Sequence, residues 1–156
     1  MATARFYHLT RDPVEALLPV LIGKANEIGL NVALRGVAED RMALLDRLLW
    51  LGDGFLPHGM AGGPHDADQP CLLVWEPVPA AELPNRPGCL VTLEGAEVTP
   101  DEAQALDRLC VVFDGMDEGA VARAREQWRA LTGAGVAAEY WSRESGRWEC
   151  KAKHPK

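Results

Sequence analysis

Three short apolar runs constrain the fold of this chain more than any other feature. Residues 71–75, 89–93 and 109–113 are almost continuously apolar, with no polar residue at alternate positions. A strand with one face in water alternates between apolar and polar residues, whereas a strand covered on both faces does not. With 156 residues, of which 47% are hydrophobic, the chain is long enough for one domain with a substantial core. The runs therefore predict buried strands of a mostly parallel sheet.

Helical patterns lie between and around these strands. Residues 14–28, 38–50 and 118–132 carry apolar side chains at helical spacing, and residues 100–106 resemble a short helix. Additional strands are predicted at residues 5–9 and 31–35, with a final pair at 136–142 and 147–151. We therefore expect an α/β fold, a single three-layer sandwich with helices on both faces of the sheet, in a Rossmann-like layout. Residues 1–150 form the predicted domain, and the basic residues 151–156 a frayed tail.

The start of the first helix carries a detailed signature. Asp12 is the expected cap, Pro13 fits the first helical position, and Glu15 completes a capping-box pattern. Pro19 conflicts with a regular helix, because an interior proline lacks a hydrogen-bond donor and clashes with the preceding turn. We expect either a kink at Pro19 or a helix whose regular part begins later.

The charge and hydropathy of the chain favour some partners over others. The formal net charge is −7, which makes a poor partner for bare nucleic acid, so contact with nucleic acid is expected only through other proteins. A module that binds single-stranded DNA directly, using the Trp side chains as stacking platforms, remains an alternative. Because the sequence shows no signal peptide and no membrane span, we expect a soluble cytoplasmic protein.

The known phosphate-binding and hydrolytic signatures do not fit. Gly23-Lys24 is the one Gly-Lys pair, and no glycine stands five residues earlier as a P-loop requires. No G-x-G-x-x-G follows the first strand, and no G-x-S-x-G elbow is present. The sequence predicts no catalytic residue, although a nucleotide-binding α/β enzyme is retained as an alternative.

Metal and disulfide sites are also not expected. The four cysteines are widely spaced, without a C-x-x-C pair, which is untypical of a zinc site or a disulfide framework. His58 and His65 lie near Asp66 and Asp68, but their spacing is loose and residues 62–68 read as a polar, flexible insert. We therefore predict no cofactor and no metal.

An aromatic-rich loop follows the second helix. The helix ends at Trp50, two glycines interrupt it, and Phe55 to His58 then place large side chains where a loop is normally polar. Such a loop is either tucked under the domain or forms a surface that binds an apolar group.

The helix predicted at residues 118–132 has a second noteworthy face. Val121, Ala124, Trp128 and Leu131 form an apolar stripe, flanked by Arg125 and, one turn later, Arg129. This pattern is typical of an ordinary amphipathic helix. Combined with the loop after Trp50, it also fits an apolar hollow edged by arginine, which suits a peptide ending in an aromatic residue and a free carboxylate. Spacing alone does not decide whether the two segments meet.

Several motifs of this chain belong together in one known family. They are Phe-Tyr-His-Leu at residues 6–9, Leu-Trp at 49–50 followed by Phe-Leu-Pro-His at 55–58, Val-Phe-Asp-Gly at 112–115, Ala-Arg-Glu-Gln-Trp-Arg-Ala-Leu at 124–131, and the closing residues 140–149. With them the sequence resembles, nearly end to end, the chi subunit of bacterial DNA polymerase III holoenzyme in its proteobacterial form. The resemblance implies a non-catalytic accessory subunit of the clamp-loader assembly. It further implies binding to the acidic C-terminal tail of single-stranded DNA-binding protein and to the psi subunit or another clamp-loader component.

The resemblance also implies a set of peptide-binding residues. They are Trp50, Phe55, Leu56, Val121, Arg125, Trp128 and Arg129. In this assignment Trp50 and Phe55 line the hollow for the terminal Phe of the tail, Arg125 takes its carboxylate, and Arg129 attracts the preceding acidic residues. The insert at 65–68, the Pro-rich loop and the polar pair Asp114-Gly115 differ from the enterobacterial form of the family.

Overall fold

An eight-stranded sheet, parallel except for its last strand, organises the molecule. We describe a computed structural model of the chain, in which residues 2–52 and 56–155 are described. The order of the strands across the sheet is β3-β4-β2-β5-β6-β1-β7-β8, and only β8 runs antiparallel, against β7. The strands are β1 (Ala4–Leu9), β2 (Val32–Arg35), β3 (Gly59–Met60), β4 (Cys71–Val74), β5 (Cys89–Thr92), β6 (Arg108–Asp114), β7 (Ala138–Ser142) and β8 (Glu149–His154).

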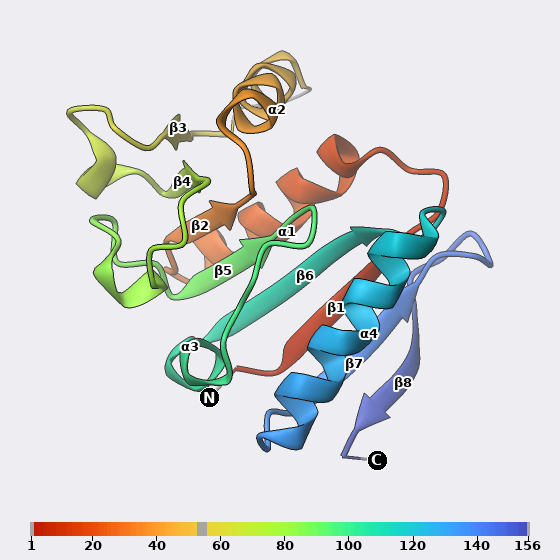
Figure 1. Cartoon of the computed structure of the whole chain (residues 1–156). Helices are drawn as coiled ribbons and strands as arrows, with labels where there is room; N and C mark the ends of the chain where they lie inside the picture. Colours follow the sequence, from red (N-terminus) through yellow and green to blue (C-terminus); the bar gives the residue numbers. More distant parts are fainter. Residues whose placement is uncertain (1, 53–55, 156) are drawn as a thin grey trace.

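Helices cover both faces of this sheet (Figure 1). They are α1 (Val14–Glu27), α2 (Glu39–Leu51), α3 (Pro100–Ala105) and α4 (Glu118–Gly133), together with the short 3₁₀ turns η1 (Asp66–Asp68) and η2 (Ala80–Glu82). Side chains from α1 and α2 pack with one face of the central strands, and those from η2, α3 and α4 pack with the other. The two resulting hydrophobic clusters form the two halves of a three-layer sandwich.

The direction of each connection explains which face its helix covers. Connections between parallel strands are almost always right-handed, so those that cross the sheet in opposite directions place their helices on opposite faces. The connections through α1 and α2 run toward the β3 edge, and those through η2, α3 and α4 run toward the β8 edge. This doubly wound arrangement confirms the predicted fold class.

Most of the predicted elements are confirmed within a few residues. The three continuous apolar runs became β4, β5 and β6, and all four residues of β4 and of β5 are buried. Thr99 caps α3 through a complete capping box with Glu102, whose side chain accepts a hydrogen bond from the Thr99 amide. No helix among the described residues is both long enough and apolar enough to span a membrane.

Two expectations at the ends of the chain are wrong. Residues 151–154 are not frayed, because they belong to β8 and pair with β7. The sequence concealed this strand because lysines alternate with small residues along it. Asp12 does not cap α1: Pro13 occupies the cap position without a side-chain hydrogen bond, and Asp12 instead pairs with Arg143 at 3.1 Å. The helix begins at Val14 and includes Pro19, so it has no late start.

Candidate protein-binding surfaces

The first group of predicted site residues lies at the end of α2. The Trp50 ring stacks on His58 with ring centroids 4.1 Å apart, and Leu56 packs against the same hydrophobic cluster as α1 and α2. His58 is buried and its Nδ1 lies 2.6 Å from the Leu56 carbonyl oxygen. Phe55 lies outside the described residues. Leu56 and His58 are therefore packed against the domain, while Trp50 itself remains 49% exposed.

The second group lies on α4. Ala124 and Leu131 are buried, and Val121 and Trp128 pack at the edge of the cluster that η2, α3 and α4 cover. The side chain of Asp117 caps the helix by accepting hydrogen bonds from the amides of the next turn. This packing turns one side of the helix toward the sheet and leaves Arg125 and Arg129 exposed on its surface.

The two groups lie in different layers of the fold. Trp50 and Leu56 belong to the layer of α1 and α2, whereas Val121, Arg125 and Trp128 belong to the layer on the opposite face of the sheet. A single hollow combining Trp50 with Arg125 therefore stays a prediction. The layers differ because the connections that carry α2 and α4 cross the sheet in opposite directions.

Beside Arg125 lies an aromatic cluster that the sequence analysis missed. Trp128 meets Phe6 and Tyr140 in edge-to-face contacts, with ring centroids 5.4 Å and 6.4 Å apart. Tyr140 also contacts Phe113, and its hydroxyl makes a short hydrogen bond with His8 Nδ1. Phe6 is the register partner of Tyr140, and His8 is the register partner of Phe113. The parallel pairing of β1 with β6 and β7 therefore brings together rings from strands that are far apart in the sequence. Only the strand order, which the sequence does not reveal, juxtaposes them.

Electrostatics link Tyr140 to Arg125. Burial raises the pKa of the Tyr140 phenol, the positive charge of Arg125 opposes this rise, and Glu144 adds to it. Arg125 is thus close enough to act on the phenol. Among the described residues, no ion pair satisfies the Arg125 guanidinium. An exposed guanidinium beside a half-buried aromatic surface can receive a carboxylate attached to an apolar group.

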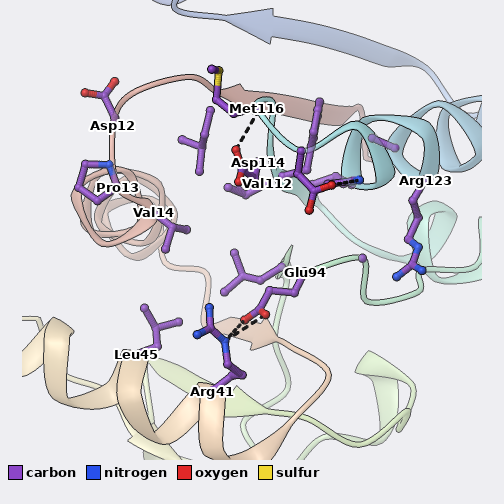
Figure 2. A pocket seen from close by; sticks show the side chains of 18 of the residues that line it. Asp12, Pro13, Val14, Arg41, Leu45, Glu94, Val112, Asp114, Met116 and Arg123 are labelled. Atoms are coloured by element: carbon purple, nitrogen blue, oxygen red, sulfur yellow. Dashed lines mark hydrogen bonds and ion pairs between the residues drawn. The ribbon is translucent and has the colours of Figure 1, made fainter.

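A groove at the carboxyl ends of β1, β5 and β6 is the usual place for a ligand in such a fold (Figure 2). It measures about 850 Å³ and lies between the start of α1, the first half of α4 and residues 41–48 of α2. In Figure 2 Arg41 points at Glu94, and the two are joined by an ion pair of 3.2 Å. Asp114 and Asp117 add carboxylates, and Asp117 already accepts from the first amides of α4. These carboxylates disfavour phosphate at this position, which argues against the nucleotide-binding alternative.

Residues considered as metal ligands have other partners. His58 Nε2 lies 3.2 Å from Asp46 Oδ1, and Asp66 accepts hydrogen bonds from the amides of Gly62 and Gly63. The described residues contain no group of three or more side chains arranged to hold a metal ion. Burial raises the pKa of the Cys71 thiol to about 12, so this thiol stays protonated and unreactive.

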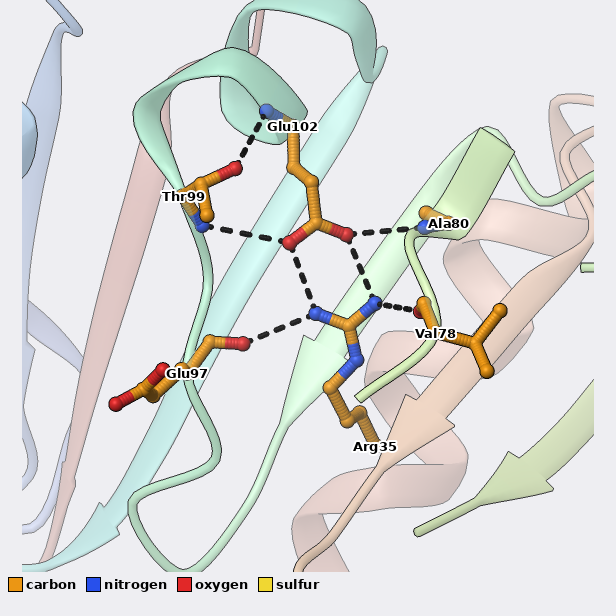
Figure 3. A network of polar contacts seen from close by, with 6 residues as sticks. All are labelled: Arg35, Val78, Ala80, Glu97, Thr99 and Glu102. Carbon is orange, nitrogen blue, oxygen red and sulfur yellow. Dashed lines mark hydrogen bonds and ion pairs between the residues drawn. The ribbon is translucent and has the colours of Figure 1, made fainter. Parts of the chain in front are cut away.

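A buried ionic network fixes the side of the molecule that carries α3 (Figure 3). Arg35, only 4% exposed, extends from the end of β2 and donates to the backbone carbonyls of Val78 and Glu97. Glu102 lies opposite it and also accepts from the amide of Ala80. The network joins the end of β2 to the segments that carry Val78 and Glu97, and its side chains face the interior of the domain. We assign it to the architecture of the domain.

These features define a class of protein: a doubly wound α/β domain whose distinctive surfaces suit binding to other macromolecules. Comparison with known protein families is consistent with this class. A family model described as DNA polymerase III chi subunit, HolC, matches residues 1–139, so the chain belongs to that family. No curated protein matches the chain. The protein is an accessory, non-catalytic subunit of the polymerase III complex that acts in DNA replication.

Proposed function

We propose that the exposed flank of α4 binds the acidic C-terminal tail of single-stranded DNA-binding protein. The observation that carries this proposal is the position of Arg125, an exposed arginine beside the aromatic pair Trp128–Tyr140. A tail that ends in Phe offers an apolar ring and a terminal carboxylate on the same residue. Binding would tie the polymerase complex to template coated with single-stranded DNA-binding protein.

Each residue of this flank has a distinct role in the proposal. Val121 and the Trp128 ring provide the apolar surface for the terminal Phe, and Arg125 takes its carboxylate in a two-point pair. Arg129, one turn further along α4, attracts the acidic residues that precede the Phe. Part of the binding free energy is therefore electrostatic, and affinity falls as salt screens the exposed charges.

A calorimetric titration with an acidic peptide ending in Pro-Phe tests the proposal. We expect saturable binding, and none with a control peptide that lacks the final Phe. Arg125→Ala should weaken binding at least tenfold, since a charge-assisted pair contributes about 1.5 kcal/mol or more.

A matched variant separates a specific contact from net charge. Arg123→Ala removes the same charge from the same helix, but the Arg123 side chain lies over the backbone of Gly95, away from Tyr140. We expect it to bind the peptide like the parent protein. Equal weakening by both substitutions, or none by Arg125→Ala, would remove Arg125 from the site.

We further propose that the end of α2 contacts another subunit of the polymerase complex, of the psi type. Trp50 is half exposed and its neighbour Leu51 is 82% exposed, so two large apolar side chains reach the surface at the end of α2. Neighbouring exposed apolar residues of this kind are typical of protein contacts. Leu51→Glu should abolish co-purification with the psi-type partner, because it places a charge in the apolar contact. Leu51→Ala only shortens the side chain and should retain the partner. Retention of the partner by Leu51→Glu would place the contact elsewhere.

A further inference from the structure

A second groove, of about 700 Å³, lies between α1 and the β1–β7 side of the sheet. Tyr7 and Trp141 are register partners on adjacent strands, so their side chains lie next to each other on the same face of the sheet. The Trp148 ring meets Tyr7 edge to face, with centroids 5.5 Å apart and planes at 83°. All three aromatic residues line the groove, and each remains partly exposed. They offer a platform of π-surfaces within a single concave site.

Positive charge is concentrated around these rings. Four cationic side chains line the groove, against the single carboxylate of Asp12; the cations are Arg5, Lys24, Arg143 and Arg147. Arg143 pairs with Asp12, and Arg5 lies 3.5 Å from Glu139. Within the described part of the chain, Lys24 and Arg147 have no ion pair, and both are exposed. Such a cluster is unexpected in a protein with a net charge of −7.

The cations stand at both ends of the aromatic platform. Arg5 lies at the amino end of β1, with Lys24 on the second half of the returning helix α1. Arg143 and Arg147 follow the carboxyl end of β7, where Arg143 reaches Asp12. Tyr7 and Trp141 lie between the two pairs. A ligand with charges at repeated positions along its length matches this layout better than one with a single terminal carboxylate.

This groove depends on residues that the family match does not include. Trp141, Arg143, Arg147 and Trp148 all lie after residue 139, where the match ends. The hairpin formed by β7 and β8 places them against β1 and α1. The matched residues contribute the other side of the groove, from β1 and α1.

We propose that this groove binds single-stranded nucleic acid directly. Proteins that bind single strands combine a cationic channel for the phosphates with aromatic side chains on which bases stack, and both components are present here. The sequence predicted only indirect contact with nucleic acid, because the net charge of the whole chain conceals a local cationic groove. An acidic peptide is the competing occupant, and the platform of three rings favours the nucleic acid.

The test measures binding of a labelled oligodeoxythymidine to the whole protein by fluorescence anisotropy at several salt concentrations. Lys24→Ala/Arg147→Ala should weaken binding about tenfold in 50 mM salt. It should also make the slope of log K against log salt shallower by about 1.4, because two phosphate contacts on a single strand are lost. The matched control is Arg47→Ala/Arg123→Ala, which removes two exposed cations outside the groove and should bind like the parent protein.

Stacking is tested separately from charge. Trp148→Ala should weaken oligonucleotide binding about tenfold with an unchanged salt slope, and Trp148→Phe should restore much of the loss. Thermal unfolding of both variants checks that the Tyr7 contact is not needed for folding.

Three results would each overturn the proposal. The first is no saturable oligonucleotide binding in 50 mM salt, and the second is equal weakening by the two double variants. The third is an acidic peptide, rather than the oligonucleotide, whose binding depends on Lys24 and Arg147.

Discussion

Arg35 and Glu102 face each other through two parallel hydrogen bonds, of 3.0 Å from Nη1 to Oε1 and 2.8 Å from Nη2 to Oε2. The two residues are 67 positions apart, and they join the end of β2 to the first turn of α3. Burial alone would raise the pKa of Glu102, but hydrogen bonds from Arg35, the Ala80 amide and the Thr99 amide outweigh it and lower the pKa. The carboxylate is therefore charged in the folded protein, and its loss leaves a buried guanidinium uncompensated.

Glu102→Gln is expected to reduce the free energy of unfolding by about 3 kcal/mol at pH 7, because breaking a buried ion pair leaves one charge unpaired. Urea denaturation measures this. The control is Glu94→Gln, which breaks the exposed pair with Arg41 and should cost less than about 1 kcal/mol. Since the folded pKa of Glu102 lies below its unfolded value, its contribution is present above the unfolded pKa and is lost as pH falls through the folded pKa. Glu102→Gln should accordingly flatten the acid limb of the stability curve, and equal losses from both variants would contradict this account.

Gly115→Ala is expected to destabilise the domain by about 2 kcal/mol through steric overlap. A Cβ at this position would collide with the imidazole of His8 and lie 2.6 Å from the backbone oxygen of Leu9. The Gly115 amide also donates to that oxygen, so the backbone has little room to move. Gly133→Ala is the control, because nothing lies within 4 Å of its Cβ and alanine favours a helix. Thermal unfolding should show a clear loss for the first variant and none for the second.

Tyr7→Phe is expected to make the protein less sensitive to alkaline unfolding. Burial, with the nearby Cys110 as a smaller cause, raises the pKa of the Tyr7 phenol to about 12. A raised folded pKa gives stability that is complete below the unfolded value of 10.0 and is lost as pH rises toward 12. Between pH 9 and pH 11.5, the free energy of unfolding should fall less steeply with pH for Tyr7→Phe than for the parent protein. Identical slopes would show that Tyr7 does not titrate differently on unfolding.

Trp50→Ala is expected to leave binding of the acidic, Phe-terminated peptide within twofold of the parent value. Trp50 and Arg125 lie in layers on opposite faces of the sheet, and the proposed peptide site uses the α4 layer alone. Calorimetry on Trp50→Ala and Arg125→Ala under the same conditions decides the point. A loss of binding in both variants would return the two residues to one site.

The positions of the strands and helices were predictable from the sequence, because each depends on neighbouring residues. Continuous apolar runs gave β4, β5 and β6, and the Ala124–Trp128 stripe identified the packed side of α4. Strand order was not predictable in this way. It decides which connections cross the sheet in which direction, and therefore that Trp50 and Arg125 lie in different layers.

Contacts that depend on pairing across the sheet were missed for the same reason. His8, Phe113 and Tyr140 come from three strands, and no local pattern links them. Arg35 at the end of a buried strand was a usable signal, since a fully buried arginine requires a partner. Its partner Glu102 was visible only as an ordinary residue of a short helix.

The lysine-bearing strand β8 also affects whether two copies of the chain can associate through their sheet edges. A sheet edge carries unpaired amide and carbonyl groups that can recruit a strand from another chain. The strand order ends at β3, which is only two residues long, and at β8, which carries Lys151 and Lys153. A very short strand and a charged strand are two means by which proteins prevent edge-to-edge aggregation. A chain cut before β8 would expose β7, with Tyr140 and Trp141, as an aggregation-prone edge strand. The last strand therefore protects the domain against aggregation.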